Sequence, residues 1–260
     1  MDMGDQQRRH SQRRRPGGTG TTGNRHCVKA GQQHKENTMQ TDGEQRLGAA
    51  DNGNTTERIN ASLASHGDGI DMNVPAKLLE SHEVYRGAIF RVEDTLIGLT
   101  TTSGSMVTIR RQVLRHAPCV VMLVHDTATD RYLIEREYRI GNDSFAYGLP
   151  AGLMDKGEDV HEAALRELRE ETGVTPISND RMRIDQVTDC YSSEGMTDEL
   201  AHIMVIHLDG FQQGERHFDA DEHVESAWVS WPDLLATHIT ASNSIIAIQH
   251  EQIRRLTAGK

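Results

Sequence analysis

The alternation of apolar and polar positions after residue 74 predicts short strands separated by a few helices. The predicted strands, rich in apolar or β-branched residues, are 85–92, 106–109, 118–124, 132–134, 182–187, 201–208 and 227–229. Helical periodicity predicts helices over 159–172 and 244–256, and a helical turn over 232–236. Helices inserted among many strands favour an α/β fold in which helices pack on a mixed sheet.

The opening third of the chain lacks these patterns. Residues 1–73 are rich in Gly, Gln, Thr, Asn and Arg, and the first aromatic residue of the chain is Tyr85. Such a segment buries too little apolar surface to order itself, so we predict a disordered polar tail over 1–73 and one domain over 74–260. The arginines between positions 8 and 15 could bind nucleic acid or an anionic surface, but a solvated tail is the favoured interpretation because Asp2 and Asp5 interrupt the cluster and no aromatic residues interleave it.

Charge and cysteine usage limit the classes of partner. The formal net charge is −11, and the acidic excess lies in residues 74–260, so nucleic acid is an unlikely partner. The cysteines, Cys27, Cys119 and Cys190, include no CxxC pair, which fits reduced thiols. We expect no membrane partner and a cytoplasmic location, because no apolar stretch has the length of a signal or a span. The 14 histidines lack an HxxxH pair and are interpreted as ordinary polar positions.

Acidic residues are concentrated in the segment GLMDKGEDVHEAALRELREETGV, residues 152–174. The stretch Gly157-Glu158-Asp159 puts acidic residues at the start of the predicted helix, and Gly173 supplies its C-terminal stop. Val160, Ala164 and Leu168 recur every four residues, so this stripe can face a sheet.

Three further glutamates of this helix lie on neighbouring turns of one surface. Glu167 and Glu171 are four residues apart, and Glu170 lies beside them. Like charges at this spacing cost about 0.2–0.5 kcal/mol per pair in an isolated helix. The alternatives are an exposed helix with ion pairs to its own arginines, or a site that holds a cation.

The spacing in this segment resembles the Nudix box, and the chain is identified as a member of that family. The match is Gly152, five residues, Glu158, seven residues, then Arg166-Glu167-Leu168-x-Glu170-Glu171-x-Gly173-Val174. The resemblance implies a Nudix α/β/α sandwich with a mixed β-sheet and a pyrophosphohydrolase that uses Mg²⁺ or Mn²⁺. Clustered carboxylates are hard oxygen ligands suited to these ions.

The resemblance also implies roles for individual residues. The metal ligands would be the backbone carbonyl of Ala151 and the side chains of Glu167, Glu170 and Glu171. Arg166 would pair with a box glutamate and orient it, while Glu158 would shape the loop or a distal metal shell.

The flanking segments resemble the ADP-ribose pyrophosphatase branch of the family. The stretch REYR, residues 136–139, and the stretch GLPAG, residues 148–152, match its RQYR-like and ELPAG segments. The stretch SSEGMTDE, residues 192–199, matches its SPGxxxE loop, whose glutamate completes the metal site or activates water. Glu199 falls on that glutamate, with Glu170 the other candidate for a catalytic base.

Arginines are the candidate substrate-binding residues. Arg139 and Arg136 lie in the REYR stretch, and Arg139 either grips a phosphate or pairs with an acidic neighbour. Arg111 either reaches the substrate of a partner subunit or lines a solvent face. A homodimer is expected, since the resemblance implies that strands within residues 80–109 pair subunits.

We therefore predict hydrolysis of ADP-ribose to AMP and ribose 5-phosphate. Two departures bear on the substrate: Gly148 replaces a common glutamate, and Glu194 replaces a proline typical of ADP-ribose hydrolases. The alternatives are another nucleoside diphosphate sugar, a dinucleoside polyphosphate, and a noncatalytic nucleotide sensor on a Nudix fold. Such sensors commonly lose box glutamates, which this chain retains.

Overall fold

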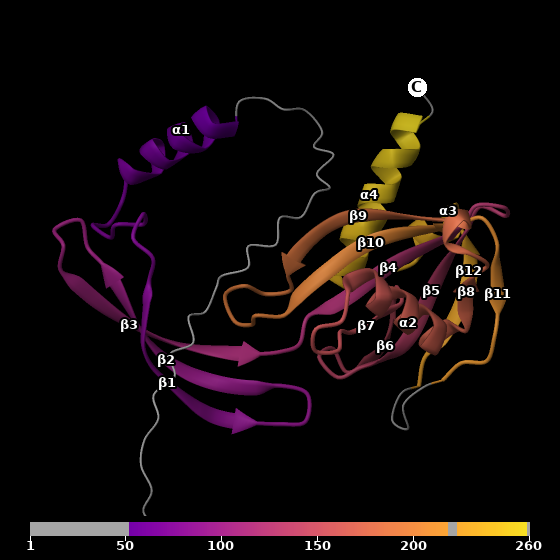
Figure 1. The fold of residues 1–260 in the computed structure, drawn as a ribbon, viewed down its shortest axis with the longest axis horizontal. Helices are drawn as coiled ribbons and strands as arrows, with labels where there is room; N and C mark the ends of the chain where they lie inside the picture. The colour runs from indigo at the N-terminus through magenta and orange to yellow at the C-terminus, as the bar shows by residue number, and fades with distance from the viewer. Residues whose placement is uncertain (1–51, 218–222, 259–260) are drawn as a thin grey trace, which may run out of the picture. The chain divides into compact units, whose positions relative to one another are not determined.

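The computed structural model describes residues 52–217 and 223–258 (Figure 1). The prediction that the tail is disordered falls largely on residues 1–51, which lie outside this range. Within the remainder of the predicted tail the chain forms a helix, α1 (Asn52–Ala64). Its residues from position 55 onward are exposed, so this helix is not held by a buried apolar face.

A three-stranded antiparallel meander follows, in the order β1-β2-β3. Its strands are β1 (Lys77–Arg86), β2 (Arg91–Thr100) and β3 (Met106–Arg115). The predicted strand over 85–92 is wrong, because those residues span the turn between β1 and β2. All of β1 is exposed, so its sequence carries no alternation of buried and exposed positions that could mark the strand.

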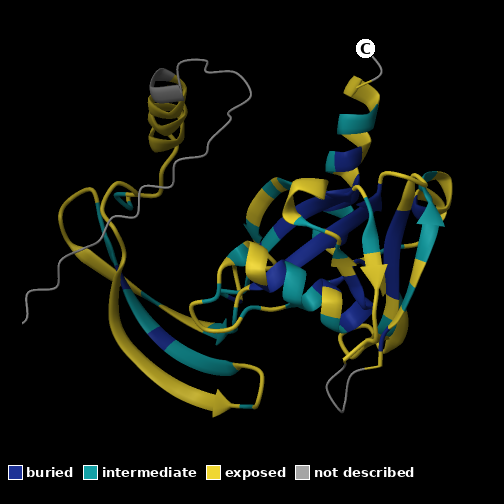
Figure 2. Cartoon of the chain, turned by 45° about the vertical axis from the view of Figure 1, so that its right-hand side comes forward, coloured by how far each residue is buried: buried dark blue, intermediate teal, exposed yellow. Residues whose placement is uncertain are grey.

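The central sheet has seven strands and holds most of the core (Figure 2). It consists of β4 (Cys119–Asp126), β5 (Arg131–Arg139), β6 (Ser144–Gly148), β7 (Ala151–Leu153), β9 (Met182–Tyr191), β10 (Leu200–Leu208) and β12 (Glu225–Ser230). The order is β12-β5-β4-β10-β9, with β6 on β5 and β7 on β4. The sheet is mixed, because β4 and β10 are parallel while the other paired strands are antiparallel.

Short elements complete the domain. The strands β8 (Val174–Pro176) and β11 (Phe211–Gln213) pair with each other, and a 3₁₀ turn, η1 (Asn179–Arg181), precedes β9. Helix α3 (Trp231–Ala236) buries Leu234.

The two faces of the sheet are covered by different helices. On one face, Val120 and Met122 of β4 join a core with Ala164 and Leu168 of α2 (Val160–Thr172). On the other face, alternate residues of β4 join a core with Ala247 and Ile248 of α4 (Ser242–Ala258). The predicted α/β/α sandwich with a mixed sheet is therefore confirmed.

Helix α2 has the predicted signals at both ends. The Asp159 side chain caps it by accepting hydrogen bonds from the amides of His161 and Glu162, at 2.9 and 3.2 Å. Gly173 ends it with φ 73°, a left-handed conformation that favours glycine. A Cβ at Gly173 would also lie 2.4 Å from the carbonyl oxygen of Gly214. These signals fix where the acidic helix begins and ends.

Two smaller expectations concern cysteines and membranes. The cysteines in the described ranges are free thiols: Cys119, buried in β4, and Cys190, half-buried in β9. None of the helices in the described ranges is long and apolar enough to cross a bilayer.

Candidate functional site

The candidate site lies where α2 packs beside β7 and the loop that precedes the helix. The carboxylate of Glu167 rests against the backbone of Gly152, in space that any larger residue would fill. A Cβ built at Gly152 would be 2.0 Å from Cδ of Glu167 and 2.3 Å from each of its carboxylate oxygens. Contacts under about 3 Å force displacement, so a glycine at position 152 leaves room for this carboxylate.

Arg166 organises one side of the glutamate cluster. Its guanidinium donates to both carboxylate oxygens of Glu158, each at 2.8 Å. The same group reaches Glu167 at 2.7 Å, Glu170 at 3.2 Å and the carbonyl oxygen of Leu153 at 3.0 Å. One cation therefore ties the loop before α2 to two box glutamates.

These ion pairs lower the pKa of the glutamate and raise that of the arginine, as expected for a salt bridge. The hydrogen bonds from Arg166 lower the pKa of Glu158 to about 2, and the bonds to Glu158 raise the pKa of Arg166 above its usual value. The amide of Asp155 also donates to Glu158 at 2.9 Å. Glu158 is thus bound to the loop and to Arg166, which fits the predicted loop-shaping role.

The other side of the cluster holds two buried carboxylates, Glu171 and Glu135. Glu171 is 9% exposed, and one of its oxygens accepts a 3.2 Å hydrogen bond from the amide of Ala151. Glu135, on β5, is 6% exposed, and its Oε1 atom is buried without a hydrogen-bond partner. Burying a carboxyl oxygen without a hydrogen-bond partner destabilises the folded protein, so packing alone does not explain a glutamate at this position.

The acidity of both groups reflects burial and mutual repulsion. Burial is the main cause that raises the pKa of Glu171, followed by the charges of Glu135 and Glu167. Burial likewise raises the pKa of Glu135, and the charges of Glu137 and Glu167 raise it further. The carboxylates are therefore close enough to destabilise one another when they are charged.

A divalent cation fits this donor set. The carboxylates of Glu167, Glu171 and Glu135 are hard oxygen donors, which Mg²⁺ and Mn²⁺ prefer. The pKa values of Glu171 and Glu135 stay raised despite the arginines around the cluster, and the Oε1 atom of Glu135 has no hydrogen-bond partner. Glu170 is more peripheral, since its two oxygens contact Arg166 and Arg169, both at 3.2 Å.

The predicted arginines occupy three different environments. Arg139 is exposed and pairs with Glu137, the neighbour of Glu135 on the same face of β5. Arg136 lies on the opposite face by strand alternation and pairs with Glu225 of β12 at 2.5 Å. Arg111 lies on β3 of the meander, exposed, and donates to the carbonyl oxygen of Arg110 at 2.9 Å.

Glu199 lies at the entrance to β10 and beside the segment that follows β3. Its Oε1 atom is 3.5 Å from Nδ1 of His116, and its amide donates to the hydroxyl of Thr197 at 3.1 Å. The same loop is fixed to the end of β3, because Leu114 donates to the carbonyl of Met196 at 2.8 Å. The loop that carries Glu199 is thus attached to the meander as well as to the sheet.

A cavity of about 640 Å³ opens beside the loop before α2. Four cationic side chains line it: Arg86, Arg91, Arg115 and Lys156. The three arginines already pair with carboxylates of the meander or of the loop that carries Glu199. The cavity is lined by Glu158 but by none of the other box glutamates, so it adjoins the cluster on its loop side.

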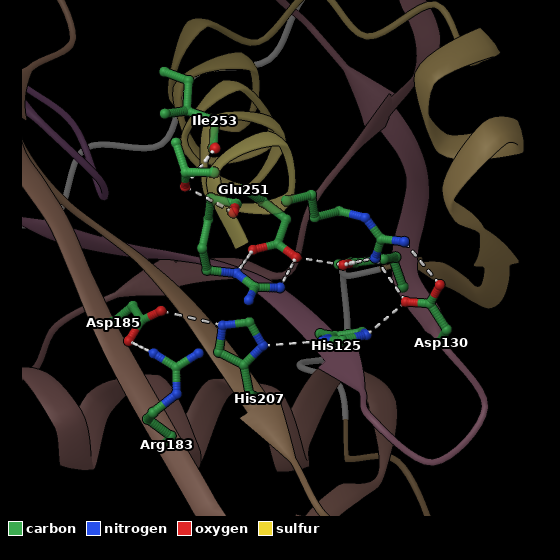
Figure 3. Close-up of polar contacts among 11 residues, drawn as sticks. His125, Asp130, Arg183, Asp185, His207, Glu251 and Ile253 are labelled. Atoms are coloured by element: carbon green, nitrogen blue, oxygen red, sulfur yellow. Dashed lines mark hydrogen bonds and ion pairs between the residues drawn. The ribbon is translucent and has the colours of Figure 1, made fainter. Parts of the chain in front are cut away.

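A second group of potential ligands comes from β4, β10 and α4 (Figure 3). Atoms of His125, His207 and Glu251 lie within 4.8 Å of one another. The parallel pairing of β4 with β10 sets the two histidines side by side, with their Nδ1 atoms 2.9 Å apart.

The side chains of this second group already make hydrogen bonds and ion pairs with neighbouring residues. The Nε2 atoms of His125 and His207 contact Asp130 at 3.0 Å and Asp185 at 3.2 Å, and the guanidinium of Arg254 contacts Glu251 at 2.6 Å. Burial is the main cause that lowers the pKa of both histidines, to about 4 for His207. The only carboxylate of the group, Glu251, is bound by Arg254 and also accepts a hydrogen bond from the hydroxyl of Tyr132 on β5, which ties α4 to the sheet.

Sequence reasoning missed Glu135 as a member of the cluster. The signal for it is an acidic residue directly after the apolar run Tyr132–Ile134, at a position with the same facing as buried Leu133. The pairing of His125 with His207 had no such signal, because it depends on strands far apart in the chain.

The mixed sheet between two helical layers, with a glutamate-rich helix in the Nudix-box spacing of residues 152–174 packed on one face, is the arrangement expected of the Nudix class of proteins. The NUDIX domain family matches residues 115–247, about half of the chain, and the chain belongs to this family.

Individual relatives agree with that assignment. The chain is 28% identical over 149 residues to the ADP-ribose pyrophosphatase of Bacillus subtilis strain 168, covering 56% of this chain and 77% of the relative. It is 34% identical over 96 residues to the ADP compounds hydrolase NudE of Escherichia coli strain K12, covering 37% and 50%. It is also 25% identical over 182 residues to the methanol dehydrogenase activator of Bacillus methanolicus, covering 68% and 93%.

A solved structure supports the fold. The crystal structure of an ADP compounds hydrolase superposes with a TM-score of 0.53 at 22% identity, covering 72% of this chain and 96% of that one. The predicted resemblance to the Nudix family and its ADP-ribose pyrophosphatase-like branch is confirmed by these matches.

Proposed function

We propose that this protein hydrolyses the diphosphate bond of ADP-ribose, giving AMP and ribose 5-phosphate, with Mg²⁺ or Mn²⁺ as cofactor. The observation that carries the proposal is the buried carboxylate cluster around Glu171, in which neighbouring charges repel one another and the Oε1 atom of Glu135 has no hydrogen-bond partner. Similarity to an ADP-ribose pyrophosphatase and to an ADP compounds hydrolase supports the choice of substrate class.

The residues of the cluster have complementary parts in this proposal. Glu167, Glu170, Glu171 and the carbonyl of Ala151 would hold the ion, and Arg166 would keep the glutamates in position. The ion would neutralise the diphosphate and lower the pKa of an attacking water. Arg139, exposed near the cluster, would bind a phosphate, and Glu199 would accept the proton of the attacking water.

Arg136 and Arg111 are retained as weaker substrate-binding candidates. Arg136 would need the substrate to extend to the far face of β5, where this residue pairs with Glu225. Arg111 would act only on a substrate bound by another subunit. The cytoplasmic location also stays a prediction.

The test is a panel of nucleotides assayed with Mg²⁺, with Mn²⁺ and with EDTA. We expect ADP-ribose to give AMP and ribose 5-phosphate with either metal, and no product in EDTA. Faster cleavage of another nucleoside diphosphate sugar or of a dinucleoside polyphosphate would move the assignment to that substrate. Binding of ADP-ribose without cleavage in both metals would favour the noncatalytic sensor.

A homodimer is the second part of the proposal, and the meander is its expected interface. Three large apolar side chains of β1 are strongly exposed: Leu78 at 61%, Val84 at 57% and Tyr85 at 52%. A small sheet with exposed apolar residues is stabilised when another surface covers it. Sedimentation velocity at several concentrations should give twice the chain mass. A monomer at every concentration with full activity would contradict this part.

A further inference from the structure

Glu135 is an acidic residue in an otherwise apolar stretch of β5. The three residues before it, Tyr132, Leu133 and Ile134, are buried hydrophobic residues of the two cores. Glu135 is as buried as they are, and its Oε1 atom has no hydrogen-bond partner. An apolar residue of similar volume would avoid the cost of burying this group, so packing alone gives no reason for a glutamate here.

Strand geometry puts this side chain on the face that α2 covers. Successive residues of a strand point to opposite faces, and Leu133 packs in the same core as Ala164 and Leu168 of α2. Glu135 therefore shares the face of Leu133. The charge of Glu135 acts on Glu171 of that helix, which agrees with this placement.

The positive charges of Arg139 and Arg216 act on Glu135, yet burial and the charges of Glu137 and Glu167 still raise its pKa. The guanidinium of Arg139 pairs with Glu137, and that of Arg166 pairs with Glu158, Glu167 and Glu170. Neither arginine has a hydrogen bond to Glu135, whose Oε1 atom remains unpartnered.

We propose that Glu135 is a further ligand of the divalent metal ion, contributed by β5, so that the sheet as well as α2 supplies carboxylates to the site. This inference rests on the proposed function, because it concerns the same metal ion. A divalent ion would give the unpartnered oxygen its missing partner and would balance the charges of Glu135 and Glu171.

The experiment measures metal binding without substrate. Mn²⁺ is titrated into the wild-type protein and into Glu135→Gln, Glu137→Gln and Glu171→Gln, and free Mn²⁺ is followed by electron paramagnetic resonance. We expect Glu135→Gln to raise the Mn²⁺ dissociation constant by at least about tenfold. Glu137→Gln is the matched control, because it removes the same charge from the same face of β5 at a carboxylate paired with Arg139. We expect it to have a clearly smaller effect.

Thermal unfolding in EDTA separates ligation from a structural role. Removing a buried carboxylate that has one unpartnered oxygen should leave the metal-free Glu135→Gln protein at least as stable as the wild type, while Mn²⁺ stabilises it less. A structural role predicts the reverse, a less stable metal-free protein with unchanged Mn²⁺ affinity. Should the Gln variant fail to fold, Glu135→Leu provides an apolar replacement for the same two measurements.

The outcomes distinguish this inference from the proposed function. Wild-type Mn²⁺ affinity in Glu135→Gln, together with weak binding in Glu171→Gln, overturns the role of Glu135 and leaves the metal site intact. Equal losses in Glu135→Gln and Glu137→Gln also overturn it, because they indicate a general effect of charge. Wild-type affinity in all three variants, or no Mn²⁺ binding by the wild type, overturns the metal site itself.

Discussion

Replacing Glu171 or Glu167 by glutamine is expected to lower kcat by at least about a hundredfold while the fold is retained. Charge stabilisation by a catalytic metal ion contributes several kcal/mol, and about 3 kcal/mol corresponds to roughly a hundredfold in rate. Glu171 is buried beside the amide of Ala151, and Glu167 rests against Gly152, so an amide fits each position but binds a cation weakly. Steady-state kinetics on ADP-ribose with Mg²⁺ or Mn²⁺ measures the loss.

The matched control is Glu162→Gln, an exposed glutamate in the first turn of the same helix. It removes one charge from α2 at a distance of more than one turn from Glu167, and kcat should stay near the wild-type value. Wild-type kcat in both cluster variants would show that the cluster holds no catalytic metal.

Unfolding in EDTA as a function of pH checks that these variants act through charge. The pKa of Glu171 is raised in the folded protein above its ordinary value of 4.5, mainly by burial. Stability from such a group is fully present below its unfolded pKa and is lost as pH rises toward the folded pKa. The metal-free wild type should therefore lose thermal stability as pH rises above about 4.5, and Glu171→Gln should lose less. Identical pH dependence would exclude a buried, repelled carboxyl at this position.

Local signals in the sequence were sufficient to predict the acidic helix and the longer strands of the central sheet, but the short strands β6 and β7 were not predicted. Asp159 and Gly173 mark the ends of α2 through hydrogen bonding and backbone conformation, which depend on neighbouring residues only. The uninterrupted apolar run of β4 reflects burial on both faces of the sheet. The meander gave a weaker signal, because its exposed first strand has no buried face.

Contacts between residues that lie far apart in the chain could not be predicted from the sequence. His125 and His207 meet because β4 and β10 pair in parallel with these residues in register. Glu135 joins the glutamates of α2 only once β5 and the helix pack on the same face of the sheet. The predicted role of Arg136 illustrates the same limit, since the REYR stretch alone does not show which arginine shares a face with the cluster.

The contacts of the candidate base Glu199 are compatible with two different roles, which kinetics can separate. In the structure its carboxylate approaches His116, and its loop is bonded to the end of β3 through Met196 and Leu114. A carboxylate in this place could activate water once substrate is bound, or could serve only to hold His116. The two roles predict different kinetics, because a base acts on the chemical step.

If Glu199 is the general base, Glu199→Gln should lower kcat by about 10²–10⁴-fold with little change in KM. The variant should also lose the acidic limb of the pH profile of kcat, since no carboxylate remains to be protonated there. Glu194→Gln, an exposed position of the same loop, controls for loop charge, and His116→Gln controls for the contact with His116. An equal loss in His116→Gln would assign Glu199 a positioning role. An unchanged kcat in Glu199→Gln would return the base to a box glutamate, with Glu170 the next candidate because its side chain is more exposed than those of Glu167 and Glu171.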